Sequence, residues 1–139
     1  PLLAKRASQY DPRVRSRIER GATMSASDYI DLLNARQHWI VRMEAALAPY
    51  DALLSPTVPL VAPPIADVAP GAERDAEFFR VNALLLRNTS VVNMLDGCAL
   101  SLPCHMAGEL PVGLMVWHGA LHDDAVLNVG LQIEQILQK

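Results

Sequence analysis

Apolar residues recur every three or four positions between about 26 and 48, which is the spacing of one face of an α-helix. Ser25 precedes this segment as a candidate N-cap, and Asp28 follows three residues later, where a capping box places its acid. Pro49 cannot continue a helix and therefore marks its end. The apolar stripe of this long helix consists of Tyr29, Leu32, Leu33, Ile40, Met43 and Leu47.

Three further helices are predicted from shorter patterns. Asp11 as N-cap and Pro12 at the first helical position predict a helix over about 12–20. Another is expected over about 75–87, and a last one over about 123–137 begins with acidic residues that suit the positive end of a helix dipole. Helices are therefore expected near both ends of the chain and in its middle.

Dense apolar runs, short and bounded by Pro and Gly, predict strands over 98–103 and 112–118. The link between these runs is short and contains Gly108, so the two strands are expected to form an antiparallel hairpin. A shorter strand is predicted over 52–55, where Pro56 ends it. The stretch after it is expected to be loop, because prolines and a glycine deny it regular structure: Pro63, Pro64, Pro70 and Gly71.

These elements predict an α/β chain with a mixed β-sheet flanked by helices. One domain is expected over 1–139, with a helical segment over 1–50 followed by strands, the Pro-rich loop and helices over 51–139. Three strands are few for a closed α/β domain, and strands as apolar as these need cover on both faces. The chain is therefore expected to be incomplete, and the start at Pro1 instead of Met suggests that it was cut from a longer one.

Composition narrows the class of protein. With 51% hydrophobic and 19% charged residues, the chain can bury a core. The formal net charge is -3 and arginines are interleaved with acids, which argues against nucleic acid as a partner. No apolar run is long enough to cross a bilayer and no signal peptide is visible, so no membrane partner is expected. Two cysteines in an otherwise ordinary chain predict a reduced, cytoplasmic protein.

No catalytic residue is predicted in this chain. Ser101 lies in the middle of a predicted strand and lacks the flanking glycines of a nucleophile elbow. Lys5 and Lys139 stand close to the two ends and offer no good candidate for the base of a Ser–Lys pair. Cys98 and Cys104 match no zinc spacing, so no metal is expected.

Histidines and arginines are the remaining polar candidates. His118 and His122 span a strand end and a loop, so ordinary packing or surface roles are the favoured interpretation. Arg36 and Arg87 are better candidates for a ligand contact, with a snorkelling or salt-bridged arginine as the alternative for each.

Four residues are predicted to face a substrate: Thr57, Arg87, Asn88 and Thr89. Thr57 follows a short strand, and strand ends in α/β folds commonly line ligand clefts. The other three end the predicted helix and lead towards the next strand. Arg87 would then lie in the last helical turn, where its charge suits the helix dipole, so a structural cap is the alternative for this residue.

Nearly the whole chain resembles amidase signature enzymes, and its upstream segment DPRVRSRIERGATMSASDY looks like a helix pair of that family. The segment YDALLSPTVPLVAPPI resembles the D-x-L-L-x-P-T-x-P block of that family, and the stretch from Leu86 to Leu137 resembles its carboxy-terminal pattern. The chain departs from the pattern at His105, where the family commonly has Gly, and at Met115, where it has Gln or a similar residue. The most specific matches are Pro56-Thr57, Ser101-x-Pro103-Cys104 and Leu110-Pro111-Val112-Gly113-Leu114.

This resemblance implies hydrolysis of a carboxamide to a carboxylate and ammonia or an amine, without metal or other cofactor. In that family a Ser–Ser–Lys triad performs the reaction, and backbone N–H groups hold the oxyanion. The triad belongs to an amino-terminal Gly/Ser-rich stretch that is absent here. The chain is therefore expected to be an incomplete carboxy-terminal part of the amidase signature fold and inactive alone. Its expected partners are the missing amino-terminal part, a small-molecule amide substrate of the whole enzyme and, as a possibility left open, further copies of itself.

Two alternatives stay open. A relative within the same class is the catalytic chain of a glutamine-dependent tRNA amidotransferase, but an acid is expected there near Arg87 to hold the amino group of glutamine, so this assignment is less favoured. The alternative from another class is a free-standing, non-enzymatic α/β interaction module that self-associates.

Overall fold

The computed structural model describes residues 2–137, which fall into two compact units, one up to His38 and one from Trp39 onward. The fold class agrees with the prediction, because helices flank a small β-sheet. The helical elements of the first unit are α1 (Leu2–Arg6), the 3-10 helix η1 (Ala7–Gln9), α2 (Pro12–Gly21) and the first part of α3 (Ala26–Leu47).

The caps of the first unit form as the sequence predicts. Asp11 Oδ1 accepts hydrogen bonds from the backbone N–H groups of Arg13 at 2.9 Å and Val14 at 3.2 Å, which fixes the start of α2. At the start of α3 the Asp28 N–H donates to Ser25 Oγ at 3.1 Å, while Asp28 Oδ2 accepts from the Ser25 N–H at 3.0 Å. Hydrogen bonds from the Ser25 hydroxyl and then from its backbone N–H lower the pKa of Asp28 below its ordinary value.

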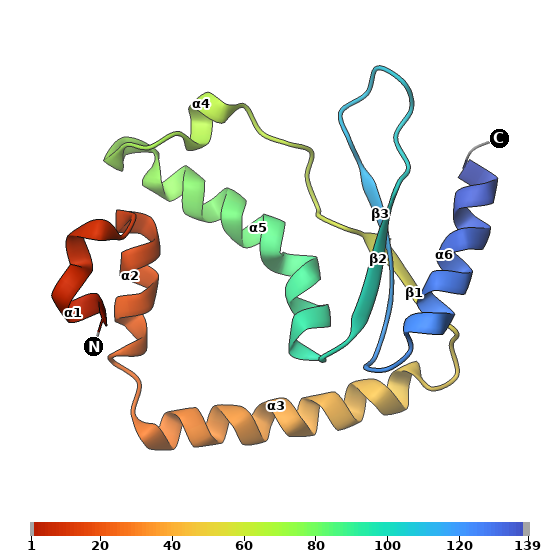
Figure 1. The fold of residues 1–139 in the computed structure, drawn as a ribbon, viewed down its shortest axis with the longest axis horizontal. Coiled ribbons are helices and arrows are strands. Elements are labelled where there is room, and N and C mark those ends of the chain that lie inside the picture. Colours follow the sequence, from red (N-terminus) through yellow and green to blue (C-terminus); the bar gives the residue numbers. More distant parts are fainter. Residues whose placement is uncertain (1, 138–139) are drawn as a thin grey trace. The chain divides into compact units, whose positions relative to one another are not determined.

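The second unit contains an antiparallel sheet with the strand order β1-β3-β2 (Figure 1). The strands β2 and β3 form the predicted hairpin, in which Ser101 lies opposite Met115. The strand β1 pairs along the other edge of β3, where Ser55 lies opposite the same Met115. The strands are β1 (Leu53–Pro56), β2 (Cys98–Pro103) and β3 (Gly113–His118).

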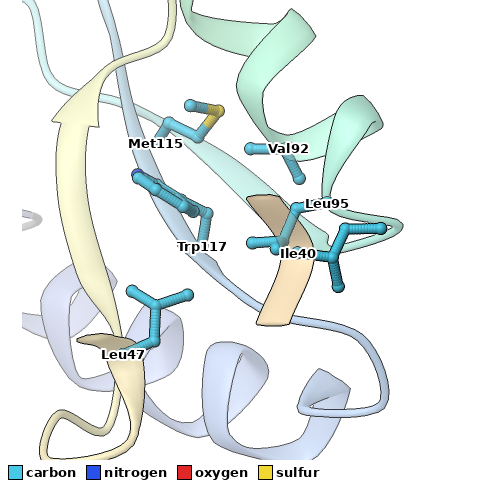
Figure 2. Packing of buried hydrophobic residues seen from close by; sticks show 6 residues of the cluster. All are labelled: Ile40, Leu47, Val92, Leu95, Met115 and Trp117. Atoms are coloured by element: carbon cyan, nitrogen blue, oxygen red, sulfur yellow. The ribbon is translucent and has the colours of Figure 1, made fainter. Parts of the chain in front are cut away.

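The helices α5 (Asp75–Met94) and α6 (Asp123–Leu137) lie on opposite sides of this sheet (Figure 1). Successive side chains of a strand point to opposite faces, so Val116 faces α6 while its neighbours in β3 face α5. The buried cluster on the α5 side consists of Ile40, Leu47, Val92, Leu95, Met115 and Trp117 (Figure 2). The buried cluster on the α6 side consists of Leu102, Val116 and Val126.

Two buried polar atoms on the α5 side have no hydrogen-bond partner among residues 2–137, namely Ser55 Oγ and Trp117 Nε1. Met115 is 3% exposed and belongs to the core. The face of the sheet that lies towards α5 is therefore filled by apolar side chains around Met115 and Trp117.

The middle helix is longer than predicted, because α5 continues to Met94 instead of ending at 87. Arg87 to Thr89 consequently lie inside the helix and do not lead into the next strand, and Arg87 is not in its last turn. The physical reason is burial: Val92 and Leu95 enter the core only if the helix continues to them, and that gain outweighs the weak helix propensity of the β-branched residues.

Two other predictions need correction. The first strand runs over Leu53–Pro56 instead of 52–55, and it tolerates Pro56 because β1 pairs with β3 on one side and needs no N–H on its outer edge. The Pro-rich stretch contains two short helices, α4 (Ile65–Val68) and the 3-10 helix η2 (Ala72–Arg74). Pro64 leads directly into α4, because its fixed φ suits the entry into a helix.

The helix α6 exposes two leucines on its outer side. Val126 and Gly130 are buried against the sheet, and an added Cβ at Gly130 would collide with the Leu100 side chain. Leu127 and Leu131 are exposed, and no charged residue stands between 125 and 133. The outer side of α6 therefore combines these leucines with exposed polar residues such as Asn128 and Gln132. In the part of the chain from 2 to 137, no helix combines the length and apolarity needed to cross a bilayer.

Candidate functional site

Two hydroxyl groups meet at the end of the sheet where β3 begins. Because β1 and β2 both run antiparallel to β3, their carboxyl ends finish together beside Gly113. The Thr57 N–H donates to the Gly113 carbonyl at 2.8 Å and so extends the β1–β3 pairing by one residue. Thr57 Oγ1 then lies 2.6 Å from Ser101 Oγ, with either oxygen able to donate.

Gly113 makes this contact possible. A Cβ at this position would lie 2.6 Å from Ser101 Oγ and 2.7 Å from Thr57 Oγ1, closer than real side chains approach. The two hydroxyls therefore bridge the outer strands across the one position of the central strand that has no side chain. We call Thr57 and Ser101 the hydroxyl pair.

Asn88 connects α5 to the same end of the sheet. It lies one turn before Val92 on the helix face that packs on the sheet. Asn88 Nδ2 donates to the Pro56 carbonyl at 2.7 Å, one residue before Thr57. This bond fixes the helix against the strand end that carries the hydroxyl pair.

Arg87 is linked to the hydroxyl pair only indirectly, by a hydrogen bond to Asn88. Arg87 Nε donates to Asn88 Oδ1 at 3.2 Å, and the side chain of Arg87 is otherwise exposed. The structure thus brings together Thr57, Asn88 and Arg87 of the four predicted substrate residues. Thr89 is different, because its hydroxyl donates to the Leu86 carbonyl of its own helix at 3.3 Å.

Earlier on the same helix, Arg80 forms an exposed ion pair that does not belong to this site. Its guanidinium donates to Glu77 through Nε at 2.8 Å and through a terminal nitrogen at 2.6 Å. These hydrogen bonds lower the pKa of Glu77 and raise that of Arg80. Arg36 lies on α3 within the unit that ends at His38.

An apolar hollow of about 320 Å³ opens at this end of the sheet. Pro56, Val112 and Gly113 line it, so the hollow adjoins the strand ends that carry the hydroxyl pair. The full lining is Pro56, Val58, Pro59, Leu60, Val61, Val112 and Gly113.

The opposite end of the sheet holds His118, which is 4% exposed. Its Nδ1 accepts from the Gly119 N–H at 2.7 Å, so the ring proton is on Nε2, which lies 3.2 Å from the Tyr50 carbonyl and donates to it. The His122 ring stacks on it with centroids 3.8 Å apart. Both nitrogens of His118 are therefore occupied by the backbone, in agreement with the packing role favoured by the sequence.

A cavity of about 290 Å³ lies beside these two rings and also borders Glu44. Over residues 2–137, no group of three or more His, Cys, Asp and Glu side chains could hold a metal ion. Cys98 and Cys104 are both free thiols.

Ser101 and Gly113 were not predicted as site residues. A serine within a strand looks the same in sequence whether it faces a core, solvent or another hydroxyl. A glycine at a strand position signals a close approach of neighbouring groups, but what approaches Gly113 depends on the register of both outer strands. The hydroxyl of Ser101 bonds to a neutral hydroxyl and not to a base, so the geometry offers no activation of Ser101 as a nucleophile.

Comparison with known proteins identifies one family. A family model described as Amidase matches residues 2–127. The chain is 26% identical over 133 residues to a 2-amino-5-chloromuconic acid deaminase of Comamonas testosteroni. It is 30% identical over 141 residues to the A chain of the glutamyl-tRNA(Gln) amidotransferase of Salinispora tropica.

These alignments cover 95% and 98% of this chain but 28% and 27% of the two relatives. The chain therefore spans little more than a quarter of their length. The crystal structure of an amidase matches 96% of this chain and 30% of the amidase chain, with a TM-score of 0.73 and 28% sequence identity.

Proposed function

Because the chain belongs to the amidase family, we propose that it is the carboxy-terminal portion of a hydrolase that converts a carboxamide to a carboxylate and ammonia or an amine. The Ser–Ser–Lys triad of this hydrolase lies outside the chain. The match over residues 2–127 carries the proposal. The additional length of the relatives and the absence of a base at Ser101 support the assignment of catalysis to another segment.

The chain supplies one wall of the substrate pocket. Thr57, Arg87 and Asn88 form this wall, since the Asn88–Pro56 and Arg87–Asn88 hydrogen bonds hold them at one end of the sheet. Arg87 offers a charged donor to the substrate, and Asn88 orients it. A pocket role for Thr89 stays a prediction, because its hydroxyl is directed at its own helix.

The partner of this chain is the rest of the same polypeptide. The exposed leucines of α6 and the outer edge of β2 offer it a surface to pack on and a strand to pair with. The whole enzyme acts in the cytoplasm on a small-molecule amide and uses neither a metal nor another cofactor.

The experiment compares the complete gene product with residues 1–139 alone, on simple aliphatic and aromatic amides, by release of ammonia. We expect turnover by the complete protein and none by the chain alone. Turnover by the chain alone that Ser101→Ala abolishes would sink the assignment of catalysis to another segment. A complete protein that hydrolyses none of these amides would remove the proposed function itself.

The exposed leucines of α6 also suit a second candidate function, a non-enzymatic module that self-associates. The two candidates differ in the complete gene product. A module predicts a dimer or larger species by light scattering together with no amide hydrolysis, whereas a hydrolase whose remaining part covers α6 predicts activity and no binding of a hydrophobic dye.

A further inference from the structure

The hydroxyl pair has hydrogen-bonding capacity to spare. Each hydroxyl carries one proton and two acceptor lone pairs, and the 2.6 Å contact between Thr57 Oγ1 and Ser101 Oγ uses one proton and one lone pair. One donor and three acceptor positions remain. Ser101 is exposed and Thr57 is half-buried, so these positions face outward from the chain.

We propose that Thr57 and Ser101, hydrogen-bonded across the bare Gly113, bind the neutral carboxamide of the substrate and discriminate against the carboxylate product. This proposal rests on amide hydrolysis as the proposed function. It adds Ser101 as a positioning residue, and it gives Gly113 a role, which is to leave room for the pair.

The chemistry of the two ligands supports this direction of discrimination. A carboxamide presents a carbonyl acceptor and an N–H donor, so the pair can donate its remaining proton to the former and accept from the latter. A carboxylate presents acceptors alone, so it meets the same single donor and also the lone pairs of two hydroxyl oxygens. A ligand that leaves polar groups of its site without hydrogen-bond partners binds much more weakly than one that pairs with them. The pair therefore favours the substrate and assists release of the product.

A structural clasp between β1 and β2 is the alternative role for the pair. It is the weaker explanation, because an exposed hydrogen bond between two neutral hydroxyls exchanges with water at little net gain. The β1–β3 pairing at this end is held in addition by the backbone bond from Thr57 to Gly113, which does not depend on the side chains.

The test uses the complete protein, with benzamide as substrate and benzoate as inhibitor, and with butyramide and butyrate as the aliphatic counterpart. Thr57→Val and Ser101→Ala each remove a hydroxyl, and Thr57→Ser is the matched control that keeps it. We expect each hydroxyl-removing variant to raise KM for the amide about three- to tenfold. The inhibition constant of the acid should stay unchanged or fall, and Thr57→Ser should behave as the wild type.

Gly113→Ala tests the same pair by displacement, since its methyl group takes the space where the hydroxyls meet. It should also raise KM for the amide without raising the inhibition constant of the acid. The melting temperature of every variant is measured alongside, because a clasp alone would lower it and would shift amide and acid binding equally.

The outcomes separate the two proposals. If the wild type hydrolyses an amide but Thr57→Val and Ser101→Ala leave KM unchanged, or change amide and acid alike, the role of the hydroxyl pair is refuted and the proposed function stands. If the wild type hydrolyses neither amide, the proposed function falls and this inference falls with it.

Discussion

At one end of the sheet His118 is 4% exposed, and both of its ring nitrogens bond to backbone groups. At the other end Thr57 and Ser101 bond to each other at the surface, beside Arg87 and Asn88. The first arrangement leaves no hydrogen-bonding capacity for a ligand, whereas the second leaves several donors and acceptors facing outward. This difference teaches that the ring of His118 serves the fold, because the backbone occupies both of its nitrogens, whereas Thr57 and Ser101 keep donor and acceptor positions for a ligand.

The largest effect on stability is expected from His118→Ala. It leaves a cavity and deprives the Gly119 N–H and the Tyr50 carbonyl of their partner. The free energy of unfolding of the complete protein should fall by about 2–4 kcal/mol, measured by urea denaturation. The kcat/KM for an amide, measured on the folded fraction, should stay within about twofold of the wild type, because the proposed pocket wall lies at the other end of the sheet.

The matched control for this variant is His122→Ala, which removes the exposed ring of the stacked pair. It should change the free energy of unfolding by less than about 1 kcal/mol. If His118→Ala instead lowers kcat/KM strongly at unchanged stability, both ends are functional and the contrast between them is lost.

The next effect is expected from Arg87→Ala. Loss of a charged hydrogen bond to the substrate, worth roughly 1.5–3 kcal/mol, should lower kcat/KM about tenfold or more. The melting temperature should change little, because Arg87 lies inside α5 and does not cap its end. Steady-state kinetics and thermal unfolding of the complete protein measure both quantities.

Arg80→Ala is the matched control on the same helix. It removes an exposed arginine whose partner is Glu77, so kcat/KM should be unaffected. An equal loss of activity in both variants would mean that the positive charge of α5 as a whole matters, and the assignment of Arg87 to the pocket would be wrong.

The smallest effect is expected at Asn88, which joins the helix to the strand end. Asn88→Ala removes the bond to the Pro56 carbonyl and should lower the free energy of unfolding by about 1 kcal/mol. Asn88→Asp should lower it further, because it turns a carboxylate oxygen towards that carbonyl in place of a donor. Urea denaturation of both variants gives this order, and an aspartate variant as stable as the wild type would show that the bond does not hold this end of the sheet.

The sequence predicted the fold well where a local signal decides it. The caps at Asp11 and Ser25 fixed two helix starts, and dense apolar runs fixed the hairpin of β2 and β3. It failed at the end of α5, where Val92 and Leu95 extend the helix through contacts with residues far along the chain. The helix propensities of the residues in α5 do not reveal these contacts, so they could not predict where the helix ends.

The arrangement of residues at this end of the sheet was predictable in part for the same reason. Thr57 and Asn88 could be expected near a strand end from their places in the chain, although the helix end assumed for Asn88 was wrong. Ser101 could not be found, because its contact with Thr57 joins two strands that are not neighbours in the sheet. That contact exists only after both registers on β3 are set.

The strand order β1-β3-β2 also affects the time course of synthesis. The ribosome delivers β1 before β2 and β3, so β1 emerges earlier than the strand with which it pairs. During that interval α5 can already hold β1 through the Asn88–Pro56 contact, while β2 and β3 close locally as a hairpin. Docking of β1 onto this hairpin brings Thr57 to Ser101, so we expect the hydroxyl pair to form among the last contacts of the nascent chain.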